Sequence, residues 1–184
     1  MKDQEASSAE EAQYARRVPA DPQAFIALYD RYFERVYNYV RYRCDEPALC
    51  DDLTAMIFEL ALTRIKGYRA ELGPFGAWLF GIARNAVNYN LRVQKRQKWQ
   101  PLDDLDDQPD EALTPEQALM DAEVQDELLV ALQHVSERER DLIGLKFAAQ
   151  LTNRRIAELT GLSESNVGVI LYRAIHKLRA ALDF

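Results

Sequence analysis

Residues 151–182 read LTNRRIAELTGLSESNVGVILYRAIHKLRAAL, and this stretch decides the fold. It predicts a short helix, a tight turn at Gly161 and a longer helix that begins after Ser163. Glycine adopts the left-handed backbone of such a turn at low cost, and a serine hydroxyl caps the helix that follows. The apolar stripe of the longer helix is Val167, Ile170, Leu171, Ala174, Leu178 and Leu182. The pattern predicts a DNA-binding helix-turn-helix, with a hairpin that only packs as the alternative.

Length and composition favour a globular protein of one or two small domains. The chain has 184 residues, of which 48% are hydrophobic and 29% are charged. It contains no apolar run of the roughly 18–20 residues that span a bilayer. The N-terminal stretch MKDQEASSAEEAQYARR lacks the apolar segment of a secretory signal. We therefore expect a cytoplasmic protein without membrane insertion.

The net charge is −7, which does not favour nonspecific DNA binding by the whole surface. DNA binding therefore requires that the cations be segregated on one part of the chain. Cys44 and Cys50 do not have zinc-ligand spacing, and we expect two ordinary thiols in a reducing compartment, with a redox pair as the alternative. The sequence predicts neither a metal nor a cofactor.

The first half predicts three helices. Residues 1–20 have the composition of a disordered lead-in that ends at Pro19 and Pro22. The next helix has an aromatic core face made of Phe25, Leu28, Tyr29, Tyr32, Phe33, Val36, Tyr37 and Val40. A second helix, capped by Asp51 or Asp52, is expected to bury Leu53, Met56, Ile57, Leu60, Ala61 and Ile65. A third, from about Phe75 to Gln97, is expected to bury Phe75, Trp78, Leu79, Ile82, Ala83, Ala86 and Leu91.

The opposite side of the third helix is polar and cationic. Its stripe consists of Asn85, Asn88, Arg92, Lys95 and Arg96. From Arg64 to Lys98 there are eight basic residues against one acid, Glu71, and aromatic residues at 68, 75 and 99 accompany them. Cations that hold a backbone and rings that stack on unpaired bases are what single-stranded nucleic acid requires. An ordinary solvated face is the alternative.

An acidic segment separates this half from the next. Residues 101–127 carry eleven acids, no Lys or Arg, and three prolines, which predicts a repelling, extended linker over 99–116. A helix is expected from Pro115 onward. Ser136 and Glu139 form a capping box that starts a helix with Leu142, Ile143, Leu145 and Phe147. The predicted fold is all-α: two small helical domains, 21–98 (a three- to four-helix bundle) and 117–184 (a helix-turn-helix bundle), joined by the linker.

The order of these pieces resembles an extracytoplasmic-function sigma factor, the two-domain type of bacterial RNA polymerase specificity subunit in the sigma-70 family. The matching stretches are FIALYDRYFERVYNYV, DDLTAMIFELALTRI, FGAWLFGIARNAVNYNLR, ALQHVSERERDLIGLKF and IAELTGLSESNVGVILYRAIHKLR. The resemblance covers nearly everything after Phe25. It implies a transcription initiation factor that binds core polymerase, recognises −35 and −10 promoter elements and promotes strand opening.

The resemblance implies that the second helix docks on the clamp helices of the polymerase β′ subunit. The matching positions are Asp51, Asp52, Phe58, Glu59 and Thr63. The two aspartates also suit a helix N-terminus without any partner. Further implied partners are the β flap, duplex and melted promoter DNA, and an anti-sigma factor, and the linker would thread toward the polymerase active-site cleft.

The −10 element would be bound by the cationic segment. The implied residues are Tyr68, Arg69, Phe75, Arg84, Asn85, Asn88, Arg92, Lys95 and Arg96. The stretch from Tyr68 to Phe75 resembles the specificity loop of the family, and Asn85 matches the asparagine of its IARN-type motif. Flipping a base costs a few kcal/mol, which a pocket that stacks and hydrogen-bonds the base offsets. Trp78 lies on the apolar stripe, which favours a core role.

The −35 element would be bound by the helix-turn-helix. The implied residues are Arg154, Arg155, Ser163, Ser165, Asn166, Val169, Tyr172, Arg173, His176 and Lys177. Gly168, Val169 and Ile170 stand where family members often have polar or basic side chains. These three positions lack the bidentate cations that carry most direct readout of guanine, so this half is expected to act mainly as an anchor.

Three other classes of protein remain as alternatives. A helix-turn-helix repressor or activator explains residues 151–182 but not the cationic segment. An enzyme is disfavoured because the sequence has no nucleophile triad, glycine-rich phosphate loop or metal spacing, and the acids of the linker lie in an expected coil. A pure interaction protein, held by an inhibitory partner, is compatible with the sigma-factor interpretation.

Overall fold

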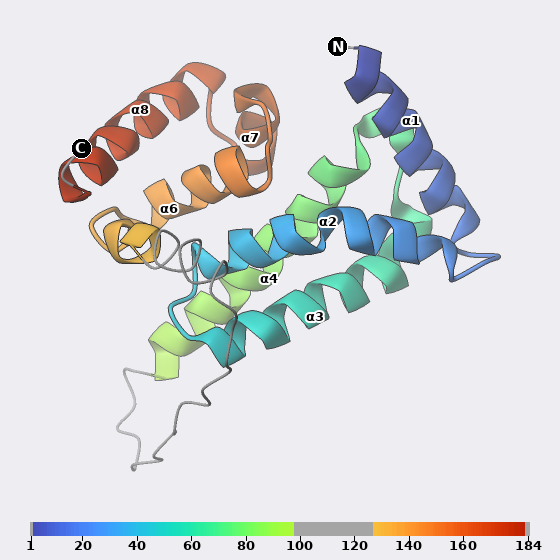
Figure 1. The fold of residues 1–184 in the computed structure, drawn as a ribbon, viewed down its shortest axis with the longest axis horizontal. Coiled ribbons are helices and arrows are strands. Elements are labelled where there is room, and N and C mark those ends of the chain that lie inside the picture. The colour runs from blue at the N-terminus through green and yellow to red at the C-terminus, as the bar shows by residue number, and fades with distance from the viewer. Residues whose placement is uncertain (1, 98–126, 183–184) are drawn as a thin grey trace, which may run out of the picture.

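The computed structural model describes residues 2–97 and 127–182, and it is helical throughout its ordered elements (Figure 1). The first half contains α1 (Lys2–Arg17), α2 (Ala24–Arg41), α3 (Pro47–Arg64) and α4 (Phe75–Gln97). The second contains a helical segment at 127–132, then α6 (Glu137–Ile143), α7 (Asn153–Thr160) and α8 (Glu164–Ala181). Within these described ranges there is no strand, and the all-α prediction is confirmed. The predicted linker at 99–116 and Trp99 lie outside them.

The N-terminal segment is a helix, and the expectation of a disordered lead-in over 1–20 is wrong. Helix α1 packs against α2 and α4 and buries Ala12 and Ala15, and Val18 directly after it is buried as well. Its Glu10 accepts an ion-pair contact from Arg31 of α2 at 2.8 Å. Small apolar residues in a polar segment provide a narrow stripe that is enough to dock a helix on an existing bundle, although composition alone indicates disorder.

Helices α2, α3 and α4 form a bundle with the predicted aromatic core. Tyr39, Phe75 and Phe80 are among its largest fully buried side chains. Two predicted core positions are only partly covered, since Tyr29 and Phe33 are each 39% exposed. Met56 was also expected to be buried but is 46% exposed, because the buried face of α3 runs through Leu53, Ile57 and Ala61 and leaves Met56 outside it.

Helix α3 begins one turn earlier than the expected aspartate cap. Pro47 occupies the first turn after Glu46, where a fixed proline φ and a missing N–H are tolerated. Asp51 and Asp52 therefore lie inside the helix and are exposed. The prediction that either residue caps this helix is wrong.

The helix caps of the second half are confirmed. The Ser136 hydroxyl accepts the Glu139 N–H while the Glu139 carboxylate accepts the Ser136 N–H. Gly161 ends α7 with φ 73°, and the Ser163 hydroxyl accepts the Asn166 N–H at 3.2 Å. After α6 the chain continues as a π-helical turn, Gly144–Ala148. A wider turn shifts the register of side chains, and Phe147, which was expected to be buried, is 51% exposed.

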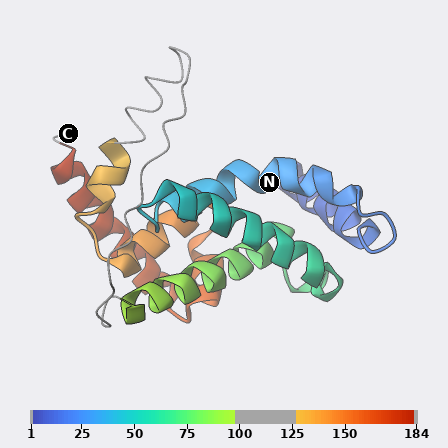
Figure 2. The same ribbon diagram turned by 90° about the horizontal axis from the view of Figure 1, so that it is seen from below.

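The two halves share one hydrophobic core. Figure 2 shows the helices of the second half lying against those of the first. The π-helical turn packs against α2, and a Cβ placed on Gly144 would lie 2.7 Å from Cδ2 of Tyr39. A backbone approach this close requires glycine at position 144. The sequence pattern predicts two linked domains and does not indicate this contact between them.

Candidate nucleic-acid interface

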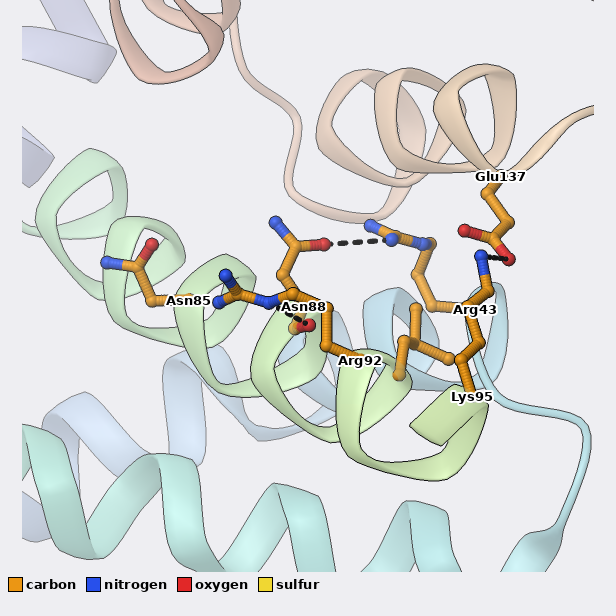
Figure 3. A pocket seen from close by; sticks show the side chains of 7 residues that line it. Arg43, Asn85, Asn88, Arg92, Lys95 and Glu137 are labelled. Carbon is orange, nitrogen blue, oxygen red and sulfur yellow. Dashed lines mark hydrogen bonds and ion pairs between the residues drawn. The ribbon is translucent and has the colours of Figure 1, made fainter. Parts of the chain in front are cut away.

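The predicted cationic stripe of α4 is largely on the surface. Asn85, Arg92, Lys95 and Arg96 are exposed along one side of the helix. Asn85, Arg92 and Lys95 line a groove of about 320 Å³ together with Arg43 and Glu137 (Figure 3). The side chain of Asn85 has no hydrogen bond within the described residues, so its amide donors and acceptor are available for a base edge.

Arg84 and Asn88, two of the residues predicted to bind the −10 element, form hydrogen bonds inside the protein. The Arg84 guanidinium donates to Asp141 Oδ2 at 2.8 Å and to the Leu159 carbonyl oxygen at 3.1 Å. The Asn88 side-chain oxygen accepts a hydrogen bond from Arg43 at 3.0 Å, which Figure 3 shows across the groove. Arg84 therefore joins the two halves directly, whereas Asn88 holds Arg43, which in turn binds Asp141 of the second half. The sequence does not predict either contact.

The loop before α4 is built on stacked aromatic rings. Tyr68 lies edge-on to Phe75, with ring centroids 5.5 Å apart, and against Trp78 at 5.6 Å. The Tyr68 hydroxyl donates to the Gly73 carbonyl oxygen at 3.2 Å, and burial raises the pKa of Tyr68, so it remains a donor. Phe75 is 1% exposed and cannot contact DNA directly, which corrects its assignment as a DNA-binding residue. Arg69 is exposed beside this cluster.

The centre of the contact between the halves is Asp141 of α6. Its carboxylate accepts hydrogen bonds from Arg43 at 2.6 Å, from Arg84 at 2.8 Å and from the Tyr39 hydroxyl at 2.8 Å. Burial, together with the neighbouring Asp141 charge, raises the pKa of Tyr39, so the phenol stays neutral and donates. Sequence reasoning missed Asp141 and Arg43. The available signal was an acid directly before the apolar pair Leu142 and Ile143.

Most members of the candidate polymerase-binding face on α3 lie on the surface. Asp51, Asp52, Glu59 and Thr63 are exposed. Phe58 is 5% exposed and packs against Phe25, Tyr29 and Phe33, so its assignment to the docking surface is wrong. The exposed apolar side chains here are Met56 and Leu62.

The outer face of α8 is exposed at the predicted positions. They are Ser165, Asn166, Val169, Tyr172, Arg173 and His176. Tyr172 is 66% exposed and stacks edge-on against His176, with ring centroids 4.6 Å apart. This face offers an aromatic ring and one arginine rather than a row of cations.

Other predicted members of this half have partners within the protein. Ser163 caps α8, Arg154 and Arg155 pair with Glu158, and Lys177 pairs with Glu139 at 2.7 Å. Hydrogen bonds from Arg155 lower the pKa of Glu158, so this acid stays ionised beside the helix-turn-helix.

The two cysteines of the chain are both in the part that the structure describes. Cys44 and Cys50 are buried free thiols, and the Cys50 Sγ lies 3.6 Å from the Cys44 carbonyl oxygen. Across 2–97 and 127–182 no group of His, Cys, Asp or Glu is arranged to hold a metal ion. Over the same ranges, none of the helices has the length and apolar character needed to cross a membrane.

Comparison with known proteins identifies two regions in the order that the sequence analysis expects. Sigma-70 region 2 matches residues 28–97, and Sigma-70 region 4 matches residues 125–178. The ECF RNA polymerase sigma factor BldN of Streptomyces coelicolor is 29% identical over 91% of this chain, which spans 63% of that protein. The ECF RNA polymerase sigma factor ShbA of Streptomyces griseus is 29% identical, with 91% of this chain and 92% of the relative covered.

Solved structures support the fold. CnrH, in complex with the cytosolic domain of CnrY, superposes with a TM-score of 0.64 at 23% identity over 96% of both chains. RpoE of Bartonella quintana, in complex with the anti-sigma factor NepR, has a TM-score of 0.67 at 18% identity over 86% of this chain and 96% of that one. With both regions matched over more than half of its length, the chain belongs to the sigma-70 family, among the extracytoplasmic-function RNA polymerase sigma factors.

Proposed function

We propose that this chain binds core RNA polymerase, directs it to specific promoters and promotes opening of the −10 element. The observation that carries the proposal is that one chain holds region 2 followed by region 4, each with an exposed polar face on the expected helix. Core binding is assigned to the α3 surface around Met56 and Glu59, −10 recognition to the loop and stripe of α4, and −35 contact to α8.

The division of work between the two halves follows from their surfaces. The α4 stripe combines an unengaged amide at Asn85 with the exposed cations Arg92 and Arg96. An amide can read a base edge, and neighbouring arginines can hold the phosphates of the same strand. The α8 face, with Val169 and Tyr172, has fewer groups for direct readout and is better suited to anchoring. A cytoplasmic location and regulation by an anti-sigma factor are part of the same proposal.

The direct test is run-off transcription in vitro with core polymerase, the full chain and a library of upstream DNA regions. Specific transcripts are expected only when both the chain and core polymerase are present. A helix-turn-helix regulator that acts without being a polymerase subunit would instead bind duplex DNA tightly and fail to bind core enzyme. That result would refute the proposal.

Asn85→Ala separates base capture from polymerase binding. We expect transcription from the promoters found in the library to fall by about ten- to a hundredfold, because a bidentate amide–base pair contributes ~1–3 kcal/mol. Affinity for core polymerase, measured by titration with labelled chain, should be unchanged. Gln13→Ala, which removes an exposed amide from α1, is the control for both measurements. Loss of core binding in Asn85→Ala would make Asn85 a structural residue.

A further inference from the structure

We propose that Glu11 of α1 is a positioning residue for −10 recognition. Through Tyr32 it sets the shape of the loop that precedes α4, and so decides how strictly this loop discriminates between bases. The proposal rests on the function assigned above. It extends −10 recognition to a helix outside the region 2 match, which begins at residue 28. Helix α1 is then a part of promoter recognition rather than a passive N-terminal segment.

Glu11 is a buried carboxylate on the side of α1 that faces the bundle. It is 5% exposed and lies on the same buried side as Ala12 and Ala15. The neighbouring Glu10 is exposed and forms the closer ion pair with Arg31, at 2.8 Å, whereas Glu11 lies 3.4 Å from Arg31. Taking a carboxylate out of water is costly unless it is paired and hydrogen-bonded. The groups that surround Glu11 therefore indicate its task.

The Tyr32 hydroxyl is one of the groups that surround Glu11. Burial raises the pKa of Tyr32, and the charge of Glu11 and a hydrogen bond to its carboxylate raise this pKa further. The phenol is therefore neutral near pH 7 and donates its proton to the hydrogen bond. A carboxylate that accepts from the hydroxyl holds it in one position, which apolar packing of the ring alone does not do.

Tyr32 is in direct contact with the start of α4. A Cβ on Gly76 would lie 2.8 Å from the Tyr32 hydroxyl oxygen, and the rings of Tyr32 and Phe75 lie edge-on with centroids 5.5 Å apart. Phe75 in turn packs against Tyr68, whose hydroxyl donates to the Gly73 carbonyl oxygen. A displacement of Tyr32 would therefore be transmitted to both ends of the loop.

Glu11 also acts on the loop without an intermediate. Figure 1 shows α1 running beside the segment between α3 and α4, and α1 packs against α4. Burial, and then the charge of Glu11, raises the pKa of Tyr68, so the carboxylate is close enough to affect both phenols. A recognition loop that is held in one shape by a supporting layer of side chains is preorganised for its ligand. We therefore expect Glu11 to affect base selection more than overall affinity.

The first experiment measures how strictly the complex of chain and core polymerase selects its −10 sequence. Affinity is measured for a fluorescent single-stranded DNA with the −10 sequence that the run-off library yields, and for its single-base variants. Glu11→Gln should reduce the ratio between the best sequence and the variants by about 2- to 30-fold, the usual reach of a residue that contacts neither ligand. Affinity for core polymerase should be unchanged.

Glu10→Gln is the matched control, because Glu10 is the adjacent, exposed acid and pairs with the same arginine. It removes a contact between α1 and α2 of the same kind and should leave the ratio unchanged. A general loss of structure changes all affinities by one factor, which cancels in the ratio. An unchanged ratio in Glu11→Gln would overturn the proposal, and so would equal reductions of the ratio in the two variants.

Tyr32→Phe tests the route from Glu11 to the loop. It keeps the ring that packs on Phe75 and removes the hydroxyl that Glu11 binds. Tyr32→Phe should relax base selection by itself, and adding Glu11→Gln should change little more, because both remove the same contact. Selection as strict as in wild type, or fully additive effects of the two changes, contradicts the proposal.

Tyr32→Phe also covers the case in which Glu11→Gln loses its helices, which circular dichroism would detect. Strict selection in a folded Tyr32→Phe chain then overturns the proposal by itself. Wild-type run-off transcription tests the proposed function separately. A wild-type chain that directs specific transcripts, together with a Glu11→Gln chain of unchanged selectivity, refutes this inference and leaves the proposed function standing.

Discussion

At Gly144 the backbone of the second half lies against the side-chain ring of Tyr39 in the first half. The neighbouring Tyr39 is fully buried and its hydroxyl donates to Asp141. The ring and the hydroxyl of Tyr39 therefore act together: the ring requires glycine at 144, and the hydroxyl places Asp141. The missing side chain at Gly144, directly after α6, leaves room for the Tyr39 ring beside the charged cluster.

Gly144→Ala tests this close approach. The added Cβ would lie 2.7 Å from Tyr39 and should lower the free energy of unfolding by about 1–3 kcal/mol, the usual cost of overpacking. Gly67→Ala is the control, because nothing lies within 4 Å of a Cβ at that position. Urea denaturation of both variants provides the measurement. If Gly144→Ala is as stable as Gly67→Ala, the halves do not approach this closely in solution.

At the scale of single elements, α4 has two sides with different tasks. Its buried side, with Leu79, Phe80 and Ala83, belongs to the core of the bundle. The polar side of α4 contains two groups of residues. Arg84 and Asn88 face the second half. Asn85, Arg92 and Arg96 face solvent. Only the solvent-facing members are free to contact DNA without rearrangement of the structure.

The double change Arg92→Ala with Arg96→Ala tests the phosphate contacts of α4. In open-complex formation by the polymerase, the slope of log K against log salt should decrease in magnitude by about 1.5, since each phosphate contributes roughly 0.7–0.9. The matched control is Arg92→Lys with Arg96→Lys, which keeps both charges and should keep the slope. A salt dependence that stays the same in the alanine variant argues against phosphate contact.

Helices α6 and α8 are joined by Glu139 and Lys177. Burial opposes ionisation of Glu139, but hydrogen bonds from Lys177 and Ser136 outweigh it and lower the pKa of the carboxyl. A lowered pKa in the folded chain means that the ionised form stabilises the fold. The stabilisation by ionised Glu139 is complete above the pKa that a glutamate has in the unfolded chain, about 4.3. It is lost as the pH falls through the lower pKa of Glu139 in the folded chain.

Glu139→Gln keeps a side chain that suits the capping box but removes the charge. We expect it to lower the free energy of unfolding at pH 7 by about 1 kcal/mol, because Lys177 is half exposed and solvent screens the pair. The difference from wild type should shrink as the pH is lowered below about 4.5. Urea denaturation from pH 3.5 to 7 measures it, and a difference that is independent of pH would contradict this account.

At the scale of the whole molecule, the shared core makes each half depend on the other. The turn from Gly144 to Ala148 packs on α2, and Asp45, beyond the end of α2, pairs with Arg140 at 3.3 Å. Ionic and apolar contacts therefore both cross the boundary between region 2 and region 4. Packing of this kind joins regions that the sequence presents as separate units.

Leu145→Ala tests whether the stability of each half depends on the other. Leu145 is fully buried, and its truncation should cost about 2–5 kcal/mol. If the halves unfold together, hydrogen exchange should accelerate in α3 as well as in α8. Ala55→Gly, at an exposed position of α3, would destabilise the first half locally by about 1 kcal/mol and serves as the reference. Acceleration confined to residues 127–182 would show that the halves are independent.

The sequence by itself determined the helices, most of their buried faces, the caps at Ser136, Gly161 and Ser163, and the location of the cations on α4. These features depend on residues within one or two helical turns, where periodicity and local hydrogen bonding are readable. Local signals gave wrong predictions at the ends of elements. Helix α3 starts at Pro47 rather than after Asp51, and α1 is helical rather than disordered because it docks on its neighbours.

Only the tertiary structure decided which of those polar residues remain available. Arg84 and Asn88 lie within one turn of Asn85 on α4, yet they face the second half. Phe58 and Phe75 are buried by rings that come from other elements. Asp141 lies about a hundred residues from Arg43 in the chain. The burial of a carboxylate between two distant arginines depends on how the helices pack, which no local pattern in the sequence encodes.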